Sequence, residues 1–514
     1  MTTNRLAVAA AFYGLLLANP LLGQQPPGGQ LFAPPGFARP VADVAPPDSY
    51  DPGFYQQTKP AAPAPVVRQR QVVRPRQSAR PKFGSISASF ARQECPPPEE
   101  EKKEEEEKPC VQCKDGPLGC FGCGCCNVEL DEPFKLGDQL HCFKKHEILV
   151  AGWIAQSYTW NPYNPSDGFN GPVTWTDQAN RYQLNELYLY AVKPVDTKGE
   201  GWDYGGRVDL LYGTNYRWDT EAGLETHLNS GKFYGLAIPQ FYGEVGYNDL
   251  KVIVGHFISP VGFYTVGTYN NFFNTIPYTY QYGEPFTHTG LLARYQVTEK
   301  INAGAGLIHG WDDFDSSFNK WGGYLGTLTV NGNADDSLAF VQVYSHEPTQ
   351  NAARPFTQRY FQTLVYSRPL KKISDKLTYI IQSDFGVQGE ATLTGKTARW
   401  YGINQYLYWK KNDLWSWGVN FEWFRDEEGF RVTAAVPSPG SPNAIGWPRG
   451  PGFAGNFYQI TFGPRWTPLP NVVVRPNFRA DWYHGPNNVE NLRPFDGGRR
   501  NLQQILATDV IITF

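Results

Sequence analysis

The 514-residue sequence has little charge and almost no methionine. Charged residues make up 18% of the chain, the net charge is −3, and the only methionine is Met1. Average soluble domains carry roughly 25% charged residues. A pI near 6.3 excludes a strongly basic nucleic-acid-binding protein, so no nucleic-acid partner is expected. Taken alone, a mean hydropathy of −0.45 also argues against a membrane protein.

Long apolar runs are missing as well. The apolar run at residues 6–18 follows Arg5 and is shorter than the ~20 residues that a spanning helix needs. It predicts a secretory signal peptide over 1–23. An uncleaved anchor is the alternative, because no small-x-small cleavage site follows. Either way, we expect an exported chain without a helical transmembrane bundle.

Tryptophan is absent from the first 146 residues, which hold 20 of the 42 prolines but only 12 of the 77 aromatic residues. Residues 24–109 are Pro- and Arg-rich and then Glu-rich, which predicts a disordered linker because such a sequence cannot bury enough apolar surface. The linker is either a solvated spacer, a binding segment for an anionic cell-wall polymer, or an Arg-rich part that folds back on the acidic part.

All eight cysteines lie between residues 95 and 142, in or near a Cys-rich segment over 110–146. Disulfides, a Zn²⁺ or iron–sulfur site, and free or lipid-modified thiols all remain open for this cluster. No C-x-x-C is followed by His, which excludes covalent c-type haem, and no cofactor is expected. The disulfide or metal candidates are Cys110, Cys113, Cys120, Cys123, Cys125 and Cys126.

Residues 147–514 have a different character, with 65 aromatic residues and all 15 tryptophans. Segments of about ten residues alternate between apolar and polar, and Gly, Asn, Asp and Pro separate them. In 472–482, for example, valines and aromatics alternate with Arg475, Arg479 and Asp481. An outer-membrane barrel explains this pattern, because its apolar face meets lipid while its lumen is wet.

Counting these segments predicts the fold class: an all-β, antiparallel up-and-down transmembrane barrel of about 16 strands (14–18 allowed) with a disordered N-terminal extension. Every odd-numbered link between predicted strands is longer than the link after it, as expected for long outer loops and short periplasmic turns. The chain ends on Phe514 in the apolar phase of the last strand, which is typical of outer-membrane barrels.

A barrel of this size leaves an aqueous lumen, which predicts passive diffusion of small hydrophilic solutes. Strand phase assigns eight charged side chains to the wall, where each could instead form an ion pair that only stiffens the barrel. These predicted pore-lining residues are Arg207, Asp209, Asp384, Arg399, Glu422, Arg475, Arg479 and Asp481.

The predicted loop at 258–286 is the candidate constriction. It is rich in aromatics and has a single charge, so it should not lie in water. It either folds into the lumen, where its aromatics could stack on sugars, or packs across the mouth. Its candidate residues are Tyr264, Tyr269, Phe272, Phe273, Tyr278, Tyr280, Tyr282 and Glu284.

Three segments of the chain resemble the putative beta-barrel porin-2, OmpL-like family: GGRVDLLYGTNY (205–216), VIVGHFISPVGFYTVGTYNNFF (252–273) and GEPFTHTGLLARYQVTEKINAGAGLIHGWDD (283–313). The resemblance covers roughly 150–514 and implies an outer-membrane porin, with the lipid bilayer as partner and, as porins often are, a homo-trimer. It carries over no functional residues and leaves the N-terminal tail outside.

Rival functions remain for a barrel of this kind. An outer-membrane enzyme is not expected, because the eight histidines are scattered and neither G-x-S-x-G nor H-E-x-x-H occurs. A barrel that encloses an electron-transfer partner is not expected either, because the sequence has no haem-attachment motif. The main alternative is a structural anchor that tethers the envelope through its tail. We therefore expect a protein of the bacterial outer membrane with its N-terminal tail in the periplasm.

Overall fold

A computed structural model describes residues 133–514 apart from 230–231, 317–321, 334–335 and 433–451. The predicted signal peptide, the linker and the six candidate cysteines lie outside the described residues. The part of the Cys-rich segment that is described forms two short helical turns, η3 (Leu136–Gln139) and α2 (His141–Lys145). Cys142, on α2, is disulfide-bonded.

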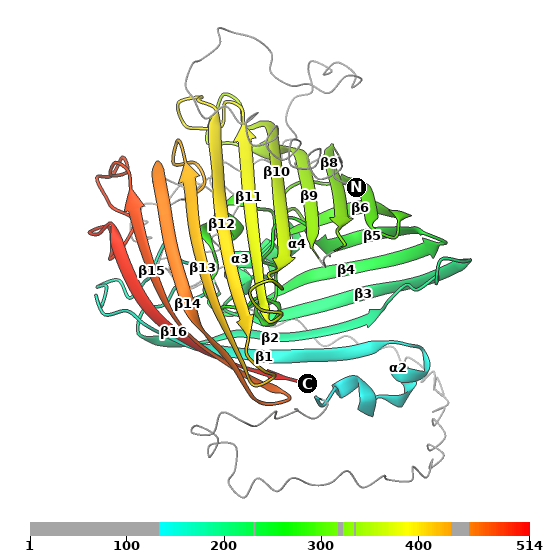
Figure 1. The fold of residues 1–514 in the computed structure, drawn as a ribbon. Helices are drawn as coiled ribbons and strands as arrows, with labels where there is room; N and C mark the ends of the chain where they lie inside the picture. The colour runs from blue at the N-terminus through cyan, green and yellow to red at the C-terminus, as the bar shows by residue number, and fades with distance from the viewer. Residues whose placement is uncertain (1–132, 230–231, 317–321, 334–335, 433–451) are drawn as a thin grey trace, which may run out of the picture. The chain divides into compact units, whose positions relative to one another are not determined.

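Sixteen strands follow, and each of them overlaps one of the sixteen predicted segments (Figure 1). Their bounds are β1 (Leu149–Trp160), β2 (Arg181–Lys193), β3 (Trp202–Gly213), β4 (Gly235–Tyr247), β5 (Leu250–Ile258), β6 (Thr287–Thr298), β7 (Ile301–Ile308), β8 (Gly323–Asn331), β9 (Ser337–Pro348), β10 (Phe356–Pro369), β11 (Leu377–Gln388), β12 (Ala398–Lys410), β13 (Trp415–Asp426), β14 (Gly455–Leu469), β15 (Val472–His484) and β16 (Leu502–Thr513).

The strands form one closed antiparallel barrel. Each pairs with its neighbours in sequence, and β1 closes the ring against β16, with Trp153 opposite Thr513 and Trp160 opposite Leu506. Closure leaves no edge strand, so the backbone groups along every strand have partners without water. The predicted fold class is confirmed.

Links between strands are sorted by length. One end of the barrel has tight turns at 248–249, 299–300 and 470–471, and the other end has long segments such as 161–180, 214–234 and 427–454. The predicted alternation fails at one place, because 349–355 and 370–376 are equally long. The long links contain the short helices α3 (Tyr216–Asp219), α4 (Leu224–Asn229), η4 (Thr268–Asn270) and η5 (Thr279–Gly283).

Alternate residues of every strand point outward, and these are mainly large apolar or aromatic side chains. Exposed aromatics gather near both strand ends, such as Trp202, Tyr204 and Trp409 at the turn end and Tyr158 and Trp160 at the loop end. Two bands of exposed aromatics with an aliphatic band between them fit the two interfaces and the core of a bilayer. Among the described residues, no helix is long and apolar enough to cross a membrane.

Candidate channel lumen

The inward faces of β2, β3 and β10–β16 carry most of the charged side chains of the barrel wall. Seven of the eight predicted wall residues point inward, and Arg207 pairs with Asp209 at 2.7 Å. Arg399 does not point inward. It alternates with Ala398 and Trp400, which are both fully buried, and its own side chain is 48% exposed, 3.6 Å from Glu427. The prediction for Arg399 is wrong, because at the loop end of β12 the inward positions hold Ala398 and Trp400, which pack in the buried apolar cluster, and the charged residue lies on the outer face.

The link between β5 and β6, residues 259–286, folds into the barrel; we call it the inserted segment. Tyr264, Phe273, Tyr278, Tyr280, Tyr282 and Glu284 are at most 4% exposed, and Tyr269 and Phe272 are partly exposed. Its contacts reach β1, β2 and β11–β15, on the wall away from its own two strands. The sequence left the inward and mouth-covering positions open, and the contacts described next place the segment inside.

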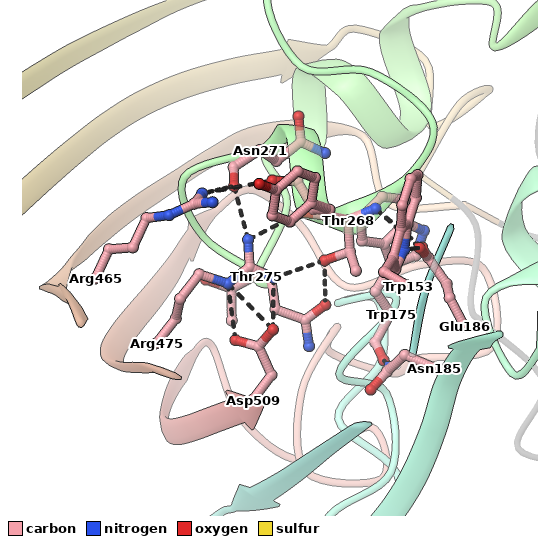
Figure 2. Close-up of polar contacts among 12 residues, drawn as sticks. Trp153, Trp175, Asn185, Glu186, Thr268, Asn271, Thr275, Arg465, Arg475 and Asp509 are labelled. Carbon is pink, nitrogen blue, oxygen red and sulfur yellow. Dashed lines mark hydrogen bonds and ion pairs between the residues drawn. The ribbon is translucent and has the colours of Figure 1, made fainter. Parts of the chain in front are cut away.

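Arg475 on β15 holds the first turn of the inserted segment (Figure 2). Its guanidinium donates to the carbonyl oxygens of Thr268 and Asn271 at 2.8 and 2.7 Å, and it also pairs with Asp509 on β16. From β2, three strands further around the ring, the Glu186 carboxylate accepts the Thr268 backbone N–H at 3.0 Å, and the Trp153 indole on β1 donates to the same carboxylate at 2.8 Å. The η4 turn is therefore fixed from both sides by charged groups that accept or donate to its backbone.

Glu422 on β13 holds the second turn. Its carboxylate accepts the Tyr278 N–H at 2.8 Å and both the N–H and the hydroxyl of Thr279 at 2.5 Å. The Tyr278 hydroxyl donates to Asp481 at 2.9 Å, and Arg479 donates to the Ile276 carbonyl. Since these N–H groups begin the π-turn η5, where intrahelical acceptors are lacking, the carboxylate supplies the acceptors that the turn itself lacks.

The last part of the inserted segment lies against β11 and β12. The Trp400 indole donates to the Gly283 carbonyl at 3.0 Å, and Gln382 bonds Glu284 and the Phe263 N–H. Burial raises the pKa of the Glu284 carboxyl well above its usual range, and the nearby Asp384 carboxylate raises it further.

A second set of links closes the loop end. Arg217, on α3, donates two hydrogen bonds to Asp177 at 2.8 and 2.9 Å, and both groups are buried. Asp312 accepts the Phe286 N–H at 2.6 Å, which ties the link 309–322 to the end of the inserted segment. Burial raises the pKa of Asp312 to about 8 and that of Glu225 on α4 to about 7.

The inserted segment and the other long links together cover the inner face of every strand at one height along the barrel axis. No inward residue at this level is more than 8% exposed. We call it the covered belt, and it comprises Ala155, Tyr188, Asp209, Gln240, Ile253, Leu292, Ile308, Leu325, Val341, Thr363, Gln382, Asn404, Glu422, Gln459, Arg479 and Ala507. The predicted wall residues at this level therefore contact protein and not water.

Nearer the turn end the inner wall is exposed, and we call this part the vestibule. The Arg207 and Arg294 side chains are 27% and 41% exposed there, and Arg294 pairs with Glu244 at 3.0 Å. On the segment's side, Phe263 is 36% exposed, and Phe272 stacks on Tyr408 with ring centres 4.4 Å apart. The vestibule thus combines a charged wall with an aromatic ledge of Phe263, Phe272 and Tyr408.

Several residues that hold the inserted segment were not singled out from the sequence. Glu186, Asp509, Gln382, Arg465 and Trp153 all point inward and contact it or its anchors. A polar residue in the inward phase of a strand was the available signal for the first four. Within the described ranges, no group of three His, Cys, Asp or Glu side chains could hold a metal ion.

A closed sixteen-stranded antiparallel barrel with an apolar outer face and a polar inner face defines the class of outer-membrane β-barrel proteins. Residues 147–514 match the family described as "Putative beta-barrel porin-2, OmpL-like", and the chain belongs to this family of the outer membrane. A search of curated proteins finds no match.

Three of the similar solved structures are each 10% identical to this chain, with TM-scores of 0.47. The outer membrane channel DcaP of Acinetobacter baumannii covers 75% of this chain and 100% of its own. OprB of Pseudomonas putida, in its high-pH structure, covers 74% and 99%. An anion-selective porin from Comamonas acidovorans covers 71% and 99%.

Proposed function

We propose that the protein is a porin that lets small hydrophilic solutes diffuse passively across the outer membrane, with the inserted segment as its constriction. The observation that carries this proposal is the inward-facing set of charged and amide side chains in a sixteen-stranded barrel, a size that leaves an aqueous lumen. A wall of this polarity suits water and polar solutes, with charge and width as the filter.

Passage through the covered belt requires the inserted segment to move. Its anchors at Glu422 and Arg475 are hydrogen bonds to backbone groups, which can exchange for bonds to water. We therefore expect a small basal conductance with brief openings, in contrast to a wide pore that stays open. Solutes from the turn end reach the vestibule first.

The side chains of the vestibule indicate which class of solute the channel would take. Its aromatic ledge offers flat apolar faces, and Arg207, Arg294 and Glu244 lie on other strands of the same wet space. Sugars and other flat-faced polar solutes combine an apolar face with hydroxyl groups, and they would stack on such a ledge. Reduction of ion current by sugars in the wild type, and its loss in Phe272→Ala, would test this point.

Planar-bilayer recording of the purified full-length chain tests the proposed channel. We expect discrete steps of small conductance, and larger or longer steps once the segment is loosened. A protein that inserts as a folded barrel and gives no steps, with or without the inserted segment, would rule out the channel.

A structural anchor is the second candidate, because the covered belt surrounds the whole inner wall. In this case the barrel only holds the protein in the membrane, and the N-terminal tail in the periplasm binds the cell-wall polymer. Co-sedimentation of the full chain with purified cell wall, compared with a chain lacking residues 24–109, distinguishes the two. An anchor binds the wall through the tail and gives no current.

A further inference from the structure

A pocket lies at the loop end of β16, in the link 485–501 that joins β15 to β16. Its volume is about 470 Å³, and it is lined by Arg493, Asp496, Arg499, Arg500, Asn501 and Leu502. The lining therefore carries three positive charges and one negative charge. Among the described residues, none of these six side chains bonds to the inserted segment, so the proposed channel does not account for the pocket.

The backbone of this link is held in a tight turn. Phe495 and Arg500 exchange backbone hydrogen bonds at 3.1 and 3.0 Å, and Phe495 is fully buried in the apolar cluster of the barrel. The Arg493 N–H donates to the Gly498 carbonyl at 2.8 Å. Gly498 has a φ of 88°, a conformation that favours glycine. The arginines therefore extend from a fixed backbone.

A buried carboxylate orients two of the three guanidinium groups. Asp496, whose side chain is 7% exposed, accepts a hydrogen bond from Arg499 at 2.8 Å and one from Arg500 at 3.0 Å. The Arg500 guanidinium also lies over the Tyr163 ring, 4.6 Å from its centre. Both arginine side chains are more than half exposed, so their remaining N–H groups can reach a ligand.

Arg493 supplies the third guanidinium group. Among the described residues, this group has no hydrogen-bond or ion-pair partner. Elsewhere at the loop end, Arg354 pairs with Glu390 at 3.4 Å. Arg399 likewise pairs with Glu427 at 3.6 Å. The excess of guanidinium groups over carboxylates distinguishes the pocket from these two surface pairs.

The pocket borders the lipid-facing surface of the barrel. Leu502, which lines it, is the first residue of β16 and is 43% exposed on the outward face. Further along this face, Leu506 lies opposite Trp160, and both are exposed. Exposed aromatic side chains near a strand end mark the height at which hydrocarbon gives way to headgroups. The pocket therefore lies at headgroup height, between guanidinium groups and an apolar side chain.

We propose that this pocket binds a phosphate group of a lipid headgroup in the outer leaflet. The long loops of outer-membrane barrels face outside the cell, so the loop end meets the outer leaflet. Guanidinium groups bind phosphate oxygens through pairs of parallel N–H donors. A phosphate monoester carries about two negative charges at neutral pH, which balance the two positive charges in excess. A free anion would gain nothing from Leu502, whereas a lipid matches both the charge and the apolar border.

The test measures binding of bisphosphorylated lipid A to the purified full-length protein by native mass spectrometry in mild detergent. The wild type should retain this lipid. Arg493→Gln/Arg499→Gln should bind it about tenfold or more weakly, because charge-assisted hydrogen bonds are lost. The matched control is Arg354→Gln/Arg399→Gln, which removes two exposed arginines of the loop end outside the pocket and should bind like the wild type. Both double variants should fold, because exposed arginines contribute little to stability.

Two further measurements identify the source of the phosphate. Lipid A without its phosphate groups should bind the wild type as weakly as the bisphosphorylated form binds the pocket variant. Inorganic phosphate at the same concentration as the lipid should not displace it. Equal binding of the dephosphorylated lipid, displacement by inorganic phosphate, or equal binding by the wild type and the pocket variant would each overturn the proposal. These readouts do not depend on conductance, so their failure is distinct from failure of the proposed channel.

Discussion

Glu422→Ala should release the inserted segment from the barrel wall. The carboxylate accepts three hydrogen bonds from Tyr278 and Thr279 in a fully buried site. Hydrogen bonds to a charged group contribute about 1.5–3 kcal/mol each. Burying the carboxylate itself costs several kcal/mol, which offsets part of this sum. A net loss of about 2–4 kcal/mol remains, which corresponds to a roughly 30- to 700-fold rise in the undocked fraction of the segment.

The assay is single-channel recording in a planar bilayer, with open probability and step size as readouts. Glu422→Ala should raise both, and Glu422→Gln should fall between it and the wild type, because an amide keeps one acceptor oxygen. Thr327→Ala, which alters an inward residue on β8 near the vestibule, is the control and should leave the current unchanged. If the folded Glu422→Ala protein conducts like the wild type, the segment either is not the constriction or is not held by Glu422.

Three further changes bear on the same arrangement. Deleting 268–280 removes both anchored turns and should raise single-channel conductance several-fold; unchanged steps would contradict the proposed constriction. Burial raises the pKa of Asp312 to about 8 and of Glu225 to about 7, so the folded loop end binds more protons than the unfolded chain. Its stability should therefore be greatest at acid pH and fall as the pH rises from about 4 to about 8, where both carboxyls are ionised in either state. Protease cleavage of the outer loops at pH 5 and pH 9 measures this, and Asp312→Asn/Glu225→Gln should weaken the dependence, leaving the part that comes from Asp219 and Glu221, whose pKa values burial also raises. Arg217→Met leaves its carboxylate partner buried without its cation and should destabilise the loop end by about 3–5 kcal/mol, measured as a lower unfolding midpoint in urea.

The strands could be predicted because the sequence alternates wherever one face meets lipid and the other does not. In β15, Val474, Phe478 and Trp482 alternate with Arg475 and Arg479, so only the face with the apolar residues can meet lipid. The same rule placed seven of the eight wall residues. It failed at the loop end of β12, where the inward Ala398 and Trp400 are apolar and the outward Arg399 pairs with the carboxylate of Glu427 in the following loop.

The alternation of apolar and polar residues could not predict that part of the chain fills the barrel. An inward carboxylate such as Glu422 has the same sequence signature whether it meets water or accepts backbone N–H groups. Its partners Tyr278 and Thr279 are more than 140 positions away in the chain. The sequence did predict that an aromatic loop of this length must be buried, but the choice between the lumen and the mouth depends on these distant contacts.

Inward glycines distinguish a filled lumen from a wet one. A wet wall gains nothing from glycine inside a strand, where the residue costs conformational entropy and packs no side chain. Gly418 on β13 faces inward, and a Cβ there would lie 2.5 Å from the Phe272 ring. Gly402 on β12 also faces inward, and a Cβ there would lie 2.8 Å from the hydroxyl oxygen of Thr279. Two inward glycines on the adjacent strands β12 and β13 therefore lie where the inserted segment packs against the wall. Since a Cβ at either position would clash with the inserted segment, the segment's docked position is part of the fold for which these two strands are built.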